Sequence, residues 1–491
     1  MAGTQHDPHL WNEDLAPVKP EHRSWSWSNI AALWVGMVVC VPTYLIASGL
    51  IQQGMSWQQA VFTVLLGNVI VLLPMLMIGH AGTKYGIPFP VLLRSSFGTK
   101  GASLPAVLRG LVACGWFGIQ TWIGGSAIYT VINIMSDTGI AGEPIAALGI
   151  DAGQLGCFIG FWLLQMYFIV KGTESIRWLE TIAAPFLLLM GLALLYWAYS
   201  QVGSWETMLS GTSQFDVGGE KEGQFWKVFW PSLTAMVGFW ATLTLNIPDF
   251  TRFAKSQRDQ ILGQSVGLPL PMALFSFIGV AVASSTLIIY GESIWDPVVL
   301  AGKFGGMTTA LALIALTVAT LTTNIAANVV APANGFSNLA PGKISFKMGG
   351  YITAGLGIAI MPWKILASSG DFIFVWLVGY SSLLGPIAGI LIVDYFFIRK
   401  QELDMDELFK SNGKYSYHKG WNPWAVMAFF VAVLPNLPGF LSASGFIGDV
   451  SPIWMDIYGY AWFVGAIIAS AIYWVAMMNC HRWGVKAPLT A

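Results

Sequence analysis

Apolar runs long enough to cross a lipid bilayer limit the fold of this chain more than any other feature of its sequence. A helix needs about 20 such residues to cross the hydrocarbon core. Runs of this kind, bounded by charges, Pro or Gly, occur about twelve times, near residues 28–51, 57–79, 104–135, 153–170, 181–199, 229–246, 265–290, 306–331, 349–363, 372–396, 423–441 and 459–478. Because a transmembrane barrel would show alternating strands of about ten residues instead, we predict an all-α integral membrane protein with about twelve transmembrane helices.

The composition excludes several classes of protein. Of the 491 residues, 55% are hydrophobic and 10% are charged, whereas soluble chains carry about 25% charged residues. A net charge of -1 offers no basic surface for phosphates, so we expect no nucleic-acid partner. The four cysteines lack CxxC spacing, which indicates neither a disulfide framework nor a zinc site. We expect no bound cofactor, and the residues indicate no obligate protein partner besides the lipid bilayer.

The positions of Lys and Arg predict the orientation in the membrane. With the amino terminus in the cytoplasm, all but four of the 24 Lys and Arg residues fall in cytoplasmic segments, as the positive-inside rule requires. We therefore expect a multi-pass protein of the cytoplasmic (inner) cell membrane with both termini in the cytoplasm.

The chain divides into segments of one membrane domain. Residues 1–27 are polar and lack the apolar core of a secretory signal, so we expect a cytoplasmic amino-terminal segment. Spans 1 to 5 (28–199) and spans 6 to 10 (200–398) would form two inverted halves, because each half has an odd number of spans. A cytoplasmic loop (399–422) then leads to two further spans and a short tail (423–491).

Charged residues are nearly absent from the interiors of the spans. Arg109, Asp249, Asp371 and Asp394 lie near span ends, so a pocket at the midplane would be uncharged, which favours a neutral solute over an ion, an amino acid or a phosphate. The sequence has no HExxH or GxSxG motif and no paired intramembrane carboxylates. We therefore expect a transporter rather than an enzyme.

Two spans show signs of interruption. Pro42 in span 1 removes a helical hydrogen bond, and in span 6 Gly238 precedes the bulky Phe239 and Trp240. Interrupted helices at corresponding positions of two halves point to a transporter binding site.

Spans 3 and 8 carry the candidate contacts for a solute. Trp116 and Gln120 are four residues apart and share one face of span 3, as Asn324 and Asn328 do in span 8. Packing between helices would also explain the first pair, whereas two asparagines in hydrocarbon require partners. Indole faces and carboxamides in an apolar setting suit a flat, neutral heterocycle with lactam or imide edges.

Several strings resemble those of the nucleobase-cation symporters of family 1, which include hydantoin and allantoin carriers. They are GHAGTKYGIPFPVLLRSSFG (79–98), GWFGIQTWIGG (115–125), FWATLTLNIPDFTRFAKSQ (239–257), ATLTTNIAANVVAPAN (319–334) and LLGPIAGILIVDYFFIRK (383–400). The resemblance covers nearly the whole chain. It implies the five-plus-five inverted-repeat fold of the leucine-transporter type, with spans 1 and 6 broken, two extra C-terminal helices, and alternating access by movement of one bundle against another.

The resemblance also implies where substrate and cation bind. In the hydantoin carriers the ring stacks between tryptophans of spans 3 and 6, and the matching substrate positions here are Trp116, Gln120, Phe239, Trp240, Asn328 and Cys40, the last of which replaces a glutamine. Asn324, one turn before Asn328, is a further candidate. The implied Na⁺ ligands are the backbone carbonyls of Gly36, Val39 and Ala319 and the hydroxyls of Thr322 and Thr323. A proton mechanism would instead use Asp249, Asp394 or His80.

The branch that this chain resembles most is that of the plant plastid carriers of uracil and purine bases, through span 1, the VGLP string of span 7 and the WLVGYSSLLGP string of span 10. We therefore expect a secondary active transporter that imports a small neutral planar cyclic amide by Na⁺ or H⁺ symport. Uracil or a related nucleobase ranks first as the substrate, and allantoin or a hydantoin ranks second. A sensor that binds such a solute without transporting it is the hypothesis from a different class.

Overall fold

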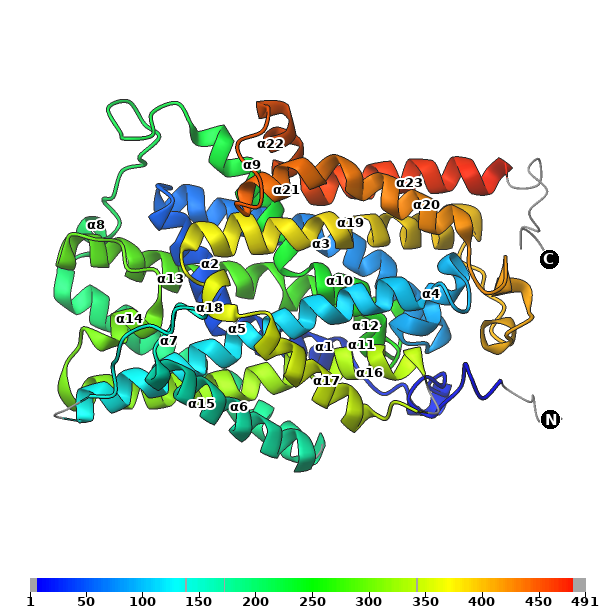
Figure 1. Ribbon diagram of the computed structural model, residues 1–491, viewed down its shortest axis with the longest axis horizontal. Helices are drawn as coiled ribbons and strands as arrows, with labels where there is room; N and C mark the ends of the chain where they lie inside the picture. The colour runs from blue at the N-terminus through cyan, green and yellow to red at the C-terminus, as the bar shows by residue number, and fades with distance from the viewer. Residues whose placement is uncertain (1–6, 137–138, 172, 341–342, 480–491) are drawn as a thin grey trace.

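The computed structural model describes residues 7–136, 139–171, 173–340 and 343–479, and most of them lie in helices that run along the longest axis of the molecule (Figure 1). Within these residues, 9 helices are long and apolar enough to cross a membrane, and one bent pair brings the number to 10. Two further helices, α7 and α17, occupy the positions of the predicted spans 5 and 9. The prediction of an all-α membrane protein with about twelve spans is confirmed.

The spans follow one another in the predicted order. They are formed by α1 (Trp27–Val38) with α2 (Val41–Gln52), α3 (Trp57–Tyr85), α5 (Ser103–Met135), α6 (Ala152–Lys171), α7 (Thr173–Val202), α9 (Phe225–Phe239) with α10 (Ala241–Asn246), α12 (Gln257–Gly267) with α13 (Pro269–Tyr290), α15 (Gly306–Asn328), α17 (Phe346–Ala359), α19 (Val378–Ile392), α20 (Pro423–Val433) with α21 (Leu437–Ala443), and α23 (Ala461–Asn479). Span 10 is not α-helical throughout, because π-helical turns at Asp371–Leu377 and Val393–Ile398 flank α19.

Span 1 is broken where its proline predicts. The helices α1 and α2 meet at 57°, and Cys40 between them is extended, with φ -146° and ψ 160°. The Cys40 amide bonds the Val38 carbonyl at 2.9 Å, and the Thr43 amide bonds the Cys40 carbonyl at 3.2 Å. In a continuous helix these two amides would bond the carbonyls of Gly36 and Val39. The break therefore withdraws the helical donors from both carbonyls.

Span 6 is interrupted more mildly than span 1. Only Trp240 separates α9 from α10, with φ -99° and ψ 3°, and the two helices are not bent against each other by more than 40°. A Cβ atom on Gly238 would collide with the Ser381 hydroxyl of α19, and the Tyr380 hydroxyl donates to the Gly238 carbonyl at 2.8 Å. This glycine therefore allows span 6 to approach span 10 closely.

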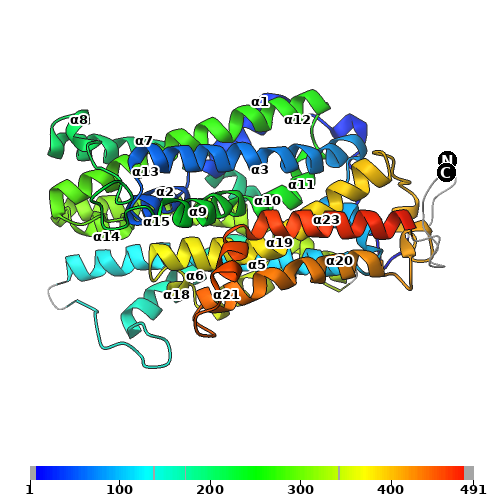
Figure 2. The same cartoon turned by 90° about the horizontal axis from the view of Figure 1, so that it is seen from above.

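The two described ends of the chain lie at the same end of the bundle, as an even number of spans requires (Figure 1). The helices α20, α21 and α23 lie together along one side of the molecule (Figure 2), where α23 packs against α19. Although α23 also contacts α9, no residue of the last two spans lines the cavity described below.

Candidate substrate site

A small cavity of about 40 Å³ lies beside the break in span 1. All the predicted substrate-binding residues except Asn324 line this cavity, together with Thr323 from the predicted cation site. The complete lining is Met37, Cys40, Pro42, Arg109, Ala113, Trp116, Gln120, Phe239, Trp240, Thr242, Leu243, Thr323, Ala327 and Asn328. Residues from four different spans therefore converge on one space.

One face of α5 forms a wall of the cavity. Arg109, Ala113, Trp116 and Gln120 all line it, at intervals that place them on one side of an α-helix. Gln120 is buried, and no hydrogen-bond partner is found for its amide among the described residues. The donor and acceptor of this carboxamide are therefore available to a ligand in the cavity.

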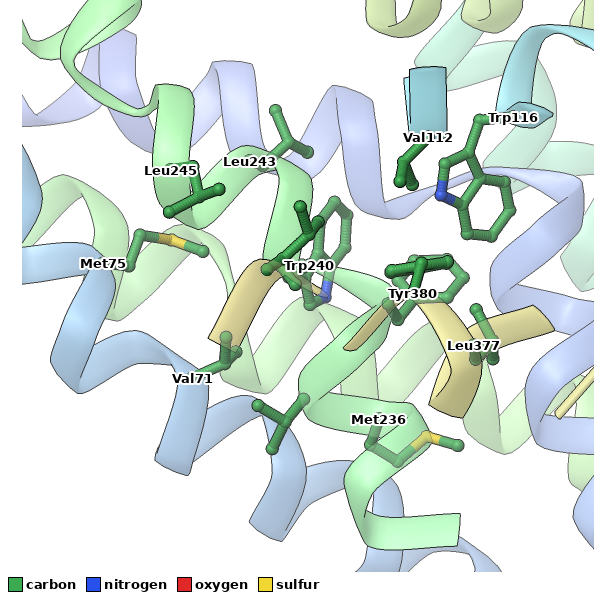
Figure 3. Close-up of a cluster of buried hydrophobic side chains, with 14 of the residues drawn as sticks. Val71, Met75, Val112, Trp116, Met236, Trp240, Leu243, Leu245, Leu377 and Tyr380 are labelled. Carbon is green, nitrogen blue, oxygen red and sulfur yellow. The ribbon is translucent and has the colours of Figure 1, made fainter. Parts of the chain in front are cut away.

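Trp116 belongs to an aromatic cluster that joins spans 3, 6 and 10. Its ring meets those of Phe239 and Tyr380 edge-on, at centroid distances of 5.3 and 6.5 Å. Phe239 also meets Trp240, at 5.0 Å, and Trp240 Nε1 donates to Asn68 Oδ1 of α3 at 2.8 Å. Figure 3 shows the Trp116 and Trp240 indoles on separate segments, with Tyr380 beside Trp116. The predicted tryptophan pair is thus linked through Phe239.

The two asparagines of α15 have different surroundings. Asn324 is fully buried, and its Nδ2 donates to Gln165 Oε1 at 2.6 Å and to the Phe117 carbonyl at 2.9 Å. Its Oδ1 accepts from Asn328 Nδ2 at 2.9 Å. Asn328 lines the cavity, whereas Asn324 does not. Asn324 therefore ties α15 to α5 and α6 and holds the side chain of Asn328 in place.

Cys40 places a thiol in the cavity at the break of span 1. Its Sγ lies 3.3 Å from Thr43 Oγ1, and that hydroxyl lies 3.6 Å from the sulfur of Met272. A thiol is a weak hydrogen-bond donor and acceptor, so this wall of the cavity offers a substrate fewer directional contacts than a carboxamide would.

The predicted cation ligands fall into two groups of oxygens. In α15 the hydroxyls of Thr322 and Thr323 donate to the Ala319 carbonyl at 2.8 and 3.0 Å, which gathers three oxygens within one turn. In span 1 the carbonyls of Gly36 and Val39 have lost their helical donors at the break. Carbonyl and hydroxyl oxygens are ligands that a hard cation accepts, so each of the two groups offers oxygens of the kind that Na⁺ binds.

Arg109 corrects the prediction of an uncharged pocket. Arg109 is close to the start of span 3 in the sequence. It nevertheless lines the cavity and is only 3% exposed. Its Nη2 donates to Asn246 Oδ1 at 2.9 Å, and its Nε lies 3.5 Å from the Thr242 carbonyl. The cavity therefore contains a guanidinium group that bridges α5 and α10.

The three candidates for proton coupling lie outside the cavity lining. Asp249 accepts from the Phe89 amide at 2.8 Å, and His80 Nδ1 lies 3.0 Å from the Tyr395 hydroxyl. Asp394 is fully buried and forms an ion pair with Arg399 at 2.7 Å. Each of these side chains therefore already has a partner within the protein.

Comparisons with known proteins agree with this geometry. Residues 17–465 match the family model described as a permease for cytosine/purines, uracil, thiamine and allantoin. A purine-uracil permease of Arabidopsis thaliana is 47% identical over 98% of this chain and 80% of its own length. The allantoin permease of Bacillus subtilis is 38% identical over 97% of this chain and 95% of its own length. The inward-facing structure of the transporter Mhp1 superimposes with a TM-score of 0.79 at 25% identity, covering 98% of this chain and 96% of Mhp1.

A membrane bundle with a broken first span and a cavity at that break defines a secondary transporter. More particularly, this chain belongs to the family of permeases for cytosine/purines, uracil, thiamine and allantoin. Its relatives are named permeases and the solved structures that it resembles are transporters, so the protein is a transporter and not an enzyme. The fold is that of Mhp1, with two C-terminal spans after the ten of the two halves.

Proposed function

We propose that this protein imports uracil or a related nucleobase by symport with a cation. The observation that carries this proposal is the cavity itself, in which the ring of Trp116 and the carboxamides of Gln120 and Asn328 face one space. A flat ring can stack on the indole, while each carboxamide offers one donor and one acceptor to ring N–H and C=O groups.

The choice among related substrates rests on the relatives and on Cys40. The Arabidopsis thaliana relative at 47% identity is named a purine-uracil permease, and the family resemblance implies a glutamine in the hydantoin carriers where this chain has Cys40. Allantoin is the second candidate, because a Bacillus subtilis relative at 38% identity is named an allantoin permease.

Uptake by the purified protein in proteoliposomes tests the substrate. We expect accumulation of radiolabelled uracil above the external concentration, and competition by purine bases stronger than competition by allantoin or hydantoins. Accumulation of allantoin but not of uracil would identify allantoin as the substrate. Binding of uracil in detergent without flux into proteoliposomes would favour a sensor and contradict the transport proposal.

Sodium is the coupling ion that we propose. The hydroxyls of Thr322 and Thr323 and the Ala319 carbonyl supply three oxygens on α15, and the break in span 1 supplies two carbonyls. Movement of one bundle against the other would separate these two groups of oxygens, which makes cation binding sensitive to the conformation.

Replacing Thr323 by valine is expected to abolish Na⁺-dependent uptake, because the variant keeps the shape of the side chain but loses one of the oxygens. Uptake by the wild type should fall at least about tenfold when choline replaces Na⁺ at fixed pH. A loss of about 1.4 kcal/mol of binding free energy already changes an equilibrium constant tenfold. The matched control is Thr317→Val, because Thr317 lies on the same helix and bonds only its own backbone at 2.8 Å. Uptake that is indifferent to Na⁺ would point to protons.

We also propose that both termini face the cytoplasm and that the protein resides in the cytoplasmic membrane. The support is the distribution of Lys and Arg, all but four of which lie in segments assigned to one side. Labelling of single cysteines introduced at the loop residues Lys410 and Lys221 tests this orientation, since a membrane-impermeant reagent added to intact cells should reach only the second.

A further inference from the structure

The guanidinium of Arg109 has one nitrogen whose N–H groups find no acceptor in the described part of the chain. Its Nη1 is buried and has no hydrogen-bond partner within the described residues, although Nη2 bonds Asn246 Oδ1 at 2.9 Å. Arg109 also forms no ion pair among the described residues, where the ion pairs involve other side chains. A buried cationic donor without an acceptor is unfavourable unless a ligand supplies one.

The position of Arg109 shows where such a ligand would lie. It lines the same cavity as Trp116, seven residues earlier on α5, and seven residues span two helical turns, or about 10 Å. The predicted orientation places the start of α5 toward the cytoplasm. The guanidinium is therefore at the cytoplasmic end of the cavity, beyond the aromatic ring on which a substrate would stack.

We propose that Arg109 forms an inner subsite of this cavity, in which Nη1 donates to a ring carbonyl oxygen of the substrate on its way to the cytoplasm. The proposal rests on the proposed function for the identity of the ring. A carbonyl oxygen at the edge of a lactam or imide is the acceptor that a guanidinium N–H prefers in a neutral ligand. A substrate that lacks this oxygen would leave the buried donor unpaired.

The contacts of Arg109 explain why the subsite would change during transport. Nε and Nη2 reach the Thr242 carbonyl and Asn246 Oδ1 on α10, while the residue itself belongs to α5. Asn246 Nδ2 in turn lies 3.4 Å from Asp249 Oδ2. Any movement of span 6 relative to span 3 would therefore alter the aim of the guanidinium, so substrate release and the closing of this end of the cavity become linked.

Thiol labelling at Cys40 tests the position of the charge without any substrate. In a background with Cys114→Ser, Cys157→Ser and Cys480→Ser, a negatively charged methanethiosulfonate should react with Cys40 faster than a positively charged one, because both enter the cavity that Arg109 lines. We expect the ratio of the two rates to fall at least about tenfold in Arg109→Met and to be retained in Arg109→Lys. An unchanged ratio in Arg109→Met would overturn the subsite, whichever compound the protein transports.

Two control variants separate a subsite from a bridge between helices. Asn246→Ala removes the bond from Nη2 but leaves Nη1, and Arg252→Gln removes a charge that does not line the cavity. Both should keep the ratio of labelling rates. If Asn246→Ala lowered the ratio as much as Arg109→Met does, Arg109 would act only as a bridge and the proposal would fail.

Competition with pyrimidines tests the partner of Nη1. In the wild type, uracil should inhibit uptake of radiolabelled uracil at least about tenfold better than 2-hydroxypyrimidine, which lacks the second carbonyl oxygen. In Arg109→Met the two compounds should inhibit equally. Persistence of the wild-type preference in this variant would contradict the assignment of the carbonyl to Arg109, whereas an absence of uracil transport by the wild type would contradict the proposed function alone.

Discussion

Replacing Trp116 by alanine is expected to weaken nucleobase uptake strongly. The indole lines the cavity and supports it through edge contacts with Phe239 and Tyr380. Stacking of a base on an aromatic side chain contributes about 1–3 kcal/mol by alanine substitution, which corresponds to an affinity loss of about 5- to 150-fold. The measurement is initial uptake of radiolabelled uracil in proteoliposomes across a range of concentrations, with the effect seen mainly as a raised KM.

Two variants distinguish stacking from a general loss of packing. Trp116→Phe keeps an aromatic face and should retain part of the uptake. Trp376→Ala removes a second indole of the same cluster, 6.3 Å from Trp116, that does not line the cavity. That variant should bind uracil with nearly wild-type affinity. Uptake by Trp116→Ala at the wild-type rate, with the protein folded in the membrane, would refute the assignment of the stacking site.

Much of the fold could be predicted from local features of the sequence. Continuous apolar runs identified the spans because a backbone in hydrocarbon must form its hydrogen bonds internally, as a long apolar helix does. Pro42 located the break of span 1 because proline removes a helical donor at a known residue. The π-helical turns beside α19 carry no comparable local signal and could not be predicted.

The site was harder to predict wherever tertiary packing decides the environment of a side chain. Asn324 and Asn328 share one face of α15, and the partners of Asn324 on other spans, Gln165 and the Phe117 carbonyl, distinguish it from Asn328, which faces the cavity. Arg109 was assigned to a span end by counting residues, although it lines the cavity and its side chain bonds α10. An arginine on the same helical face as Trp116 and Gln120 was the signal that could have revealed it.

Replacing Asp394 by asparagine is expected to destabilise the protein strongly. Asp394 is fully buried, and its carboxylate accepts from Arg399 Nε at 2.7 Å, from the Tyr473 hydroxyl at 2.7 Å and from the Ser95 hydroxyl at 3.0 Å. Arg399 also donates to the Ser95 carbonyl at 2.7 Å. The carboxylate thus joins span 10, α23 and α4 (Phe89–Phe97). Removing one partner of a buried ion pair costs about 3–5 kcal/mol, because the other charge remains buried without compensation.

The same variant decides between a structural carboxylate and a proton carrier. A structural role predicts a lower melting temperature of Asp394→Asn in detergent and partial recovery in the double variant with Arg399→Gln, because the second change removes the uncompensated charge. A proton carrier predicts a stable variant whose uptake no longer depends on pH. The ion pair and the surrounding hydroxyls already engage the carboxylate oxygens, and Asp394 does not line the cavity. We therefore expect the loss of stability, together with a pH dependence of uptake that is unchanged in whatever variant protein remains folded.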